Sequence, residues 1–252
     1  MTTGGHLEVL RQMLFRILGV AGAITIVVFC FKETTWEVLL APSEWDFCTY
    51  RWIEQAVQAV GVDFHFNEFH VDLIATDLSS QFMTHITTAV YLGVLGASPY
   101  ILYELFRFIS PALYENERKY SVQVAGIIYV LFILGVLMSY FVLFPISFRF
   151  LGTYSVSARV VSNITLDSYI STFVSLTLVM GVVFQLPVIA FFLSKLGIVS
   201  SQMLSKYRKH AFVIIMIVAA IITPPDLMTL VLVTIPLYLL YEVSIQVVRW
   251  SK

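Results

Sequence analysis

The stretch SPYILYELFRFISPALYENERK, Ser98–Lys119, lies between two long apolar runs and is unlike an ordinary hydrophilic loop. Pro99 and Pro111 each lack a backbone donor and interrupt helices, so they are predicted to bracket a short separate segment. Apolar residues recur between them at helical spacing, which predicts a short amphipathic helix at a membrane surface. The charged cluster Glu115–Lys119 follows, and its plainest interpretation is a solvated connector at the start of the next helix.

The composition places the chain in a membrane. Of its 252 residues, 59% are hydrophobic and 12% are charged, whereas a soluble domain carries about 25% charged residues. A net charge of -1 without a basic stripe argues against a nucleic-acid partner. The amphipathic N-terminus leads directly into an apolar run, so no cleavable signal is expected. We therefore expect a multi-pass integral membrane protein in contact with the lipid bilayer.

Six apolar segments approach the length needed to cross a bilayer. They predict one all-α domain over residues 1–252, a membrane bundle of six transmembrane helices with short fifth and sixth helices, at residues 14–31, 78–97, 121–144, 168–193, 211–223 and 227–248. The fifth segment has 13 residues, or about 20 Å of helix against a hydrocarbon core of about 30 Å. Residues 32–77 form an enlarged, acidic outer loop, and residues 98–119 form the first cytoplasmic loop.

The distribution of basic residues predicts the orientation. An even number of spans puts both termini on one side, and cytoplasmic loops carry an excess of lysine and arginine. With both ends inside, the cytoplasmic face holds eleven basic residues: Arg11, Arg16, Arg107, Arg118, Lys119, Lys195, Lys206, Arg208, Lys209, Arg249 and Lys252. The outer face then holds four: Lys32, Arg51, Arg149 and Arg159. The N-terminus and the C-terminus are both predicted to be cytoplasmic.

Two polar residues lie inside apolar segments, where such groups usually face a partner or a cavity. Gln185 is in the middle of the fourth segment, and Glu242 is in the sixth. The simpler alternatives are an interhelical hydrogen bond for Gln185 and snorkelling toward the cytoplasmic interface for Glu242.

The chain has no catalytic constellation that we recognise. It lacks H-E-x-x-H and G-x-S-x-G, its five histidines are scattered, and Cys30 and Cys48 have no metal-ligand spacing. We expect neither enzymatic activity nor a cofactor or metal.

Several motifs occur in an order that resembles the TatC family, the polytopic core subunit of the twin-arginine protein translocase. They are His6-Leu7-x-x-Leu10-Arg11, Ala75-Thr76-Asp77, the stretch from Ser98-Pro99 through Phe108 to Glu117-Arg118, Thr223-Pro224-Pro225-Asp226 and Tyr241-Glu242. The likeness covers nearly the whole chain. It implies a receptor in a bacterial inner membrane that binds signal peptides with consecutive arginines. It also implies single-span partners of the TatA and TatB type, homo-oligomers within the complex, and export of folded proteins driven by the protonmotive force.

The resemblance also implies roles for individual residues. Glu117 matches the carboxylate that binds the signal peptide, Phe108 matches the aromatic residue beside it, and Arg118 completes the motif. Carboxylates are the best acceptors for the planar fork of a guanidinium, which agrees with this role. Glu117 can also complement the dipole of the third helix. Gln185, Glu242 and Asp226 are expected to contact partners, and Pro99, Pro111, Pro224 and Pro225 are expected to be structural.

Three positions depart from the family pattern. Val9 stands where an acidic residue usually precedes Leu-Arg, and Glu8 is one residue earlier, about 100° around a helix. We predict that Glu8 substitutes as the second guanidinium acceptor. Gln185 stands where many members have a glutamate, and an amide cannot titrate, so protonation at this position is not part of the mechanism. Leu230 replaces a residue that is often polar.

Three other functional classes make different predictions about the sequence or about peptide binding. A secondary transporter of small solutes, the main alternative, should show internal repeats or broken helices in corresponding halves, and the short fifth segment has no counterpart in the first half. An intramembrane protease lacks a nucleophile or metal motif. A structural scaffold would have no reason to prefer twin-arginine over twin-lysine peptides.

Overall fold

The computed structural model describes residues 3–61, 63, 65, 68–69, 71–109, 121–155, 157, 163–223 and 226–250. The chain forms two compact units, one from Met1–Val38 with Asp77–Leu131 and the other from Leu39–Thr76 with Phe132–Lys252. Both consist almost entirely of helices, which confirms the prediction of an all-α membrane protein.

Within the described residues, five helical stretches are long and apolar enough to cross a membrane. They are Leu7–Cys30, Ser80–Leu105, Gly126–Thr153, Leu166–Lys195 and Leu227–Trp250, and each overlaps a predicted span. The fifth predicted segment forms a helix of only 15 residues, Arg208–Ile222. The sixth is 24 residues long, so the expectation of a short sixth helix is wrong. A count of six spans stays a prediction.

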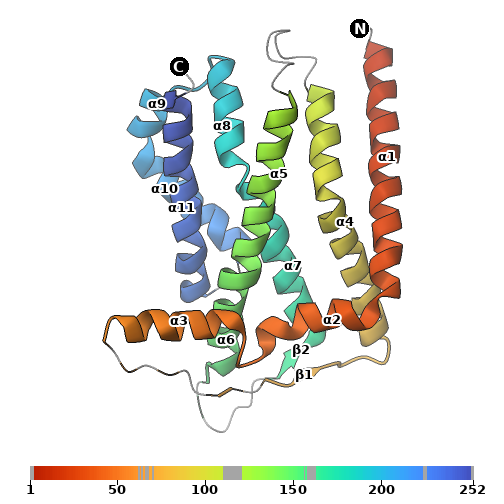
Figure 1. Cartoon of the computed structure of the whole chain (residues 1–252), viewed down its shortest axis with the longest axis vertical. Coiled ribbons are helices and arrows are strands. Elements are labelled where there is room, and N and C mark those ends of the chain that lie inside the picture. The colour runs from red at the N-terminus through yellow and green to blue at the C-terminus, as the bar shows by residue number, and fades with distance from the viewer. Residues whose placement is uncertain are drawn as a thin grey trace. The chain divides into compact units, whose positions relative to one another are not determined.

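The first unit is built on α1 (Thr3–Cys30) and α4 (Ser80–Ile109), which lie side by side in Figure 1. The helices are antiparallel, because Ile24 and Thr25 face Gly96 and Gly93, while Phe29 stacks on His85 at 4.4 Å. A Cβ on Gly93 would lie 2.9 Å from the Cα of Thr25, so glycine is what allows the two backbones to approach. α2 (Lys32–Leu40) follows α1 directly.

Pro99 does not end a helix. α4 continues through it to Ile109, so the prediction of a separate segment beginning at Pro99 is wrong. Transmembrane helices tolerate proline because local adjustments and neighbouring groups satisfy the freed carbonyl, whereas a broken helix would leave several polar groups bare in lipid. Pro111 lies outside the described residues.

One helical run, which belongs to the second unit from Phe132 onward, faces α7 (Leu166–Val183) in antiparallel fashion. The run comprises α5 (Ser121–Met138), a π-helical turn at Ser139–Leu143 and α6 (Phe144–Thr153). A Cβ on Gly135 would lie 2.5 Å from the carbonyl oxygen of Met180. Further along, the hydroxyls of Ser139 and Thr177 are hydrogen-bonded at 3.2 Å. Small residues and paired hydroxyls thus hold these two helices together.

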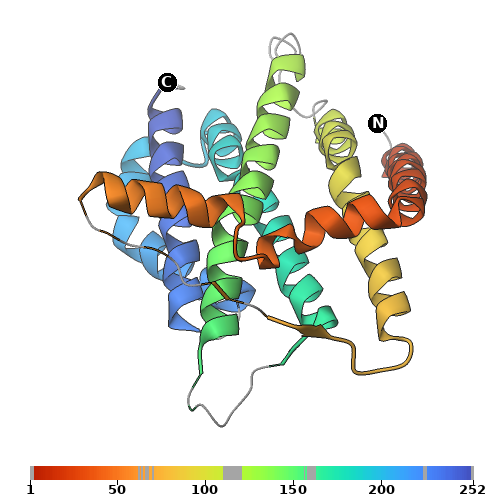
Figure 2. The same cartoon turned by 60° about the horizontal axis from the view of Figure 1, so that its bottom comes forward.

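The long loop of the second unit docks on the π-helical turn. Pro145 has no N–H to donate to the carbonyl of Phe141, and the Thr49 hydroxyl donates to that carbonyl instead. Tyr50 is buried and donates to the Pro145 carbonyl at 2.9 Å, and burial raises the pKa of its phenol, so it remains a donor. Both residues belong to α3 (Cys48–Ala59), which lies crosswise to α6 and α11 in both Figure 1 and Figure 2.

A two-residue parallel pairing joins two loops of this unit. β1 (Leu73–Ile74) pairs with β2 (Ile164–Thr165), with Leu73 opposite Ile164. The Thr165 side chain accepts a hydrogen bond from the backbone of Ser168 at 3.2 Å and so caps the start of α7.

The rest of the second unit is a cluster of four helices. They are α8 (Leu186–Lys195), α9 (Ser201–Lys206), α10 (Arg208–Ile222) and α11 (Leu227–Trp250). α8 follows α7 after a break at Phe184–Gln185, just before Pro187. α11 continues through Pro236, as α4 does through Pro99.

Candidate functional site

The candidate site lies where the N-terminal part of α1 meets the C-terminal part of α4, inside the first unit. The close packing at Gly93 and Gly96 fixes the register of these helices. In that antiparallel register, Arg16 of α1 lies opposite Glu104 of α4. Basic, acidic and aromatic side chains therefore gather at one end of a two-helix unit.

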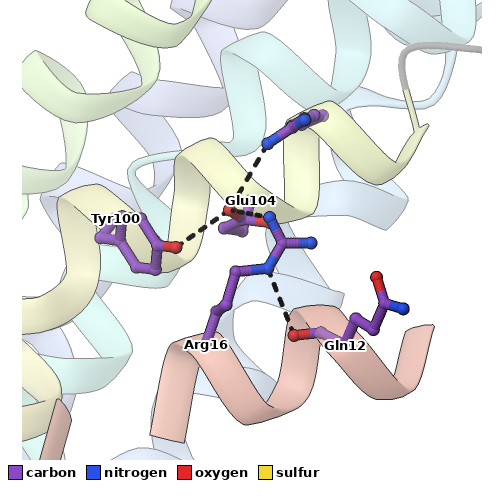
Figure 3. Close-up of polar contacts among 5 residues, drawn as sticks. Gln12, Arg16, Tyr100 and Glu104 are labelled. Carbon is purple, nitrogen blue, oxygen red and sulfur yellow. Dashed lines mark hydrogen bonds and ion pairs between the residues drawn. The ribbon is translucent and has the colours of Figure 1, made fainter. Parts of the chain in front are cut away.

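Glu104 is the centre of this group (Figure 3). Its relative exposure is 3%. Its Oε1 atom accepts hydrogen bonds from Tyr100 Oη at 3.0 Å and from Arg16 Nη1 at 3.3 Å, and it forms an ion pair with Arg107 Nη1 at 3.9 Å. Arg16 is itself oriented by α1, because its Nε donates to the carbonyl of Gln12 at 3.3 Å. A carboxylate buried this deeply is stable as an anion only when it is paired in this way.

Glu8, the predicted second acceptor, lies two helical turns before Arg16 on α1. Its side chain is 63% exposed and its nearest described cation is Arg11, at 3.7 Å. A surface ion pair of this kind contributes about 0–1 kcal/mol, so it holds Glu8 only weakly. Glu8 is thus accessible to a ligand, and its role as an acceptor stays a prediction.

Phe108 is half-buried in the last turn of α4, four residues after Glu104 and on the same helix face. Its predicted role as the aromatic residue beside the peptide's arginines stays a prediction. Glu117 and Arg118 lie outside the described residues, so their predicted roles are untested. Eight residues lie between Phe108 and Glu117 in the sequence, so their Cα atoms are no more than about 30 Å apart.

Glu104 carries only a weak signal in the sequence. It is a single acidic residue near the end of an apolar run, with Tyr100 four residues before it and Arg107 three residues after it. This spacing places all three on one helix face. The decisive partner, Arg16, is 88 residues away, and nothing local in the sequence indicates that contact.

Glu242 also pairs with an arginine, in the second unit. Arg208 of α10 donates from Nε to Oε1 at 2.7 Å and from Nη2 to Oε2 at 2.9 Å, which is a bidentate fork. Tyr238 donates to the same carboxylate at 3.2 Å. The hydrogen bonds to Glu242 raise the pKa of the Arg208 guanidinium. Neither alternative for Glu242 anticipated this internal partner, which joins α10 to α11.

Gln185 and Asp226 each cap a helix end. Gln185 is buried at the break between α7 and α8, and its amide nitrogen donates to the Gly181 carbonyl of α7 at 3.4 Å. Asp226 Oδ1 accepts a hydrogen bond from the backbone of Thr229 at 2.7 Å, which caps α11. The predicted partner contacts of Gln185, Asp226 and Glu242 remain untested, and Pro224 and Pro225 lie outside the described residues.

Metal ligands do not gather anywhere in the described part of the chain: it contains no group of three or more His, Cys, Asp or Glu side chains able to hold an ion. The candidate site itself brings the Glu104 carboxylate together with the guanidinium groups of Arg16 and Arg107.

Comparison with known proteins gives a consistent result. A family model described as Sec-independent protein translocase protein (TatC) matches residues 5–236. The TatC protein of Blattabacterium sp. subsp. Periplaneta americana is 35% identical over 246 residues, covering 96% of this chain and 92% of its own. The TatCy protein of Bacillus subtilis is 39% identical over 173 residues, covering 69% of this chain and 68% of its own. A crystal structure of a twin arginine translocase receptor, TatC, matches with a TM-score of 0.75 and 30% identity, over 98% of this chain and 99% of the other.

Proposed function

The chain belongs to the TatC family of Sec-independent protein translocase proteins, and we propose that it is a receptor for signal peptides that carry consecutive arginines. It is a multi-pass membrane protein of a bacterial translocase family. In this proposal it recognises the peptide at its cytoplasmic face and, with single-span partners of the TatA and TatB type, exports folded proteins using the protonmotive force. The family match removes the reason for the small-solute transporter alternative.

The orientation in the proposal has both termini in the cytoplasm, on the basis of the eleven-to-four distribution of basic residues. The N-terminal turns of α1 and the last turn of α4 are then cytoplasmic, and so is the loop that carries Glu117. The protein resides in the bacterial inner membrane and forms homo-oligomers within the translocase complex.

The observation that carries the proposal is the gathering of acceptors at this end of the first unit. Glu8 is exposed there, Phe108 lies one turn beyond Glu104, and α4 leads toward Glu117. Glu117 and Glu8 accept the two guanidinium groups, Arg118 flanks the site, and the ring of Phe108 packs against the arginine stems. The chemistry suits arginine better than lysine, because a carboxylate can accept the guanidinium fork at both oxygens.

Later steps of the proposal involve the second unit. The apolar part of the signal peptide passes near Gln185, and Glu242, Asp226 and the short α10 contact the single-span partners. A helix of 15 residues spans about 22 Å, less than the hydrocarbon core of about 30 Å, so the bilayer must thin around it. In this proposal the single-span partners assemble around α10 because the bilayer is thinner there.

The test is direct binding of a twin-arginine signal peptide to the purified full chain, beside its twin-lysine version. We expect the twin-arginine peptide to bind more tightly and Glu117→Gln to weaken it. Losing one partner of a desolvated charge pair costs about 2–5 kcal/mol. Glu8→Gln should weaken binding less, because Glu8 is exposed to solvent. Glu33→Gln is the matched control, since Glu33 lies in α2 in the same unit at the opposite end of α1. Equal affinity of the unaltered protein for both peptides would disprove the proposal.

A further inference from the structure

We propose that Glu104 is itself a guanidinium acceptor of the signal-peptide site, held in the resting protein by Arg16 as an internal substitute for the ligand. This inference rests on the proposed function and adds a specificity-determining residue to it. Glu104 is a single carboxylate at the cytoplasmic end of α4, four residues before Phe108, and it already binds an arginine side chain.

Among the described residues, hydrogen bonds reach only one of the two oxygens of Glu104. Tyr100 and Arg16 both donate to Oε1, and the closest approach of Arg107, at 3.9 Å, is to the same atom. Oε2 has no partner among the described residues, although the side chain is only 4% exposed. A guanidinium presents a planar fork of donors that matches both oxygens of a carboxylate at once. Within the described part of the chain, Oε2 is therefore an acceptor without a donor, beside Oε1, which accepts two hydrogen bonds.

Arg16 is held loosely. It offers one nitrogen at 3.3 Å, whereas charge-assisted hydrogen bonds of this type are typically about 2.7–2.9 Å long. Its side chain is 42% exposed, and that of Arg107 is 61% exposed. The two arginines thus cover Glu104 from the solvent side without engaging it fully, and both can swing away while remaining solvated.

Exchange of one guanidinium for another avoids the main cost of opening a buried pair. Removing a partner from a buried carboxylate normally leaves an uncompensated charge, which is strongly unfavourable. An arginine of the signal peptide that enters as Arg16 leaves keeps the carboxylate paired throughout. The exchange is favourable because the incoming fork can use both Oε1 and Oε2, in place of one long contact.

A lysine gains much less from the same exchange. Its ammonium group is a compact point charge that cannot bridge two oxygens in the fork geometry. Lysine therefore competes with Arg16 only for the contact that Arg16 already makes. Glu104 should contribute to the preference for arginine over lysine, and not only to the general attraction of cationic peptides.

The experiment measures binding of twin-arginine and twin-lysine signal peptides to four forms of the full chain: unaltered, Glu104→Gln, Arg16→Gln and the double variant. Glu104→Gln should weaken twin-arginine binding about tenfold or more, the effect of losing a hydrogen bond between charged groups, and should leave twin-lysine binding almost unchanged. Arg16→Gln should tighten twin-arginine binding several-fold, because the internal competitor is gone. In the Glu104→Gln background, Arg16→Gln should have no such effect. Glu33→Gln serves again as the carboxylate-to-amide control.

Competition predicts that the two substitutions change the affinity for the twin-arginine peptide in opposite directions: Glu104→Gln weakens binding, and Arg16→Gln tightens it. A purely structural pair would change binding in the same direction when either partner is removed. Equal tightening of both peptides by Arg16→Gln, or tightening that persists without Glu104, would indicate general electrostatics and overturn the inference. If Glu104→Gln does not fold, the affinities of Arg16→Gln for the two peptides still test the inference, because competition predicts tighter binding of the twin-arginine peptide only. If the unaltered protein binds both peptides equally, the proposed function fails, whereas unchanged discrimination in Glu104→Gln refutes only the role of Glu104.

Discussion

Glu104 of the first unit and Glu242 of the second are built from the same parts. Each has a tyrosine four residues earlier on its own helix, and each meets an arginine from the neighbouring helix. The arginines are equally exposed, 42% for Arg16 and 43% for Arg208. The geometry differs: Arg208 engages both oxygens of Glu242 at 2.7 and 2.9 Å, whereas Arg16 engages one oxygen of Glu104 at 3.3 Å.

A carboxylate can therefore be deeply buried without having a hydrogen-bond donor at both oxygens, and it can have donors at both oxygens while remaining partly exposed. Glu242 is 31% exposed and has no acceptor capacity left for an incoming guanidinium fork. Glu104 is 4% exposed, yet Oε2 has no partner within the described ranges. The saturated pair is suited to holding α10 against α11, and the unsaturated pair is suited to exchanging partners. Three experiments break or sharpen this contrast.

The largest effect is expected from Gly93→Leu. A side chain at this position meets the backbone of Thr25, with the Cβ 2.9 Å from its Cα. Overpacking typically costs about 1–3 kcal/mol, and here it separates the helices that bring Arg16 to Glu104. The melting temperature in detergent and the affinity for the twin-arginine peptide should both fall. Gly22→Leu on α1 is the control, because nothing lies within 4 Å of that position. Equal losses for the two variants would contradict the role given to Gly93.

An intermediate effect is expected from replacing each arginine by lysine. Arg208→Lys destroys a two-oxygen fork and should lower the melting temperature by a few degrees. Arg16→Lys replaces a single long contact, which an ammonium group can also make, and should have little effect on melting. A larger loss at position 16 than at position 208 would show that the two pairs do not differ in the way proposed.

The smallest effect is expected from removing the tyrosine hydroxyls. Tyr238→Phe should leave the melting temperature unchanged, because the fork from Arg208 holds Glu242 without it. Tyr100→Phe removes the shortest contact of Glu104, at 3.0 Å, and should cause a small but measurable loss. The measurement is the melting temperature of each variant, and that of Tyr100→Phe should fall further. A larger fall for Tyr238→Phe would mean that Glu242, and not Glu104, depends on its tyrosine.

The sequence predicted what depends on local composition. The length of each apolar run located the membrane-spanning helices, because a helix must be about 20 residues long to cross the hydrocarbon core. The rule that proline ends a helix failed at Pro99, since in lipid a continuous helix with one missing hydrogen bond is preferred to a broken one. The break that does occur, at Gln185, lies within a run that the sequence pattern treats as a single span.

The candidate site could be predicted only in part. Glu8 and Phe108 were identified through their family motifs, and their roles in binding stay predictions. Glu104 was missed because its importance comes from Arg16, which lies 88 residues away and depends on the register of α1 against α4. The internal partner of Glu242 was missed for the same reason, since Arg208 is 34 residues earlier and on another helix. Contacts of this kind are set by tertiary packing.

The docking of α3 on the π-helical turn also has a consequence for biogenesis. Thr49 donates to a carbonyl 92 residues later in the chain, and Tyr50 donates to one 95 residues later. A ribosome adds about 5–20 residues per second, so α3 waits about 5–20 s for its partners to be made. During this interval its aromatic side chains lie without their final contacts. The α3 segment therefore reaches its final packing only after the π-helical turn and the start of α6 have been synthesised.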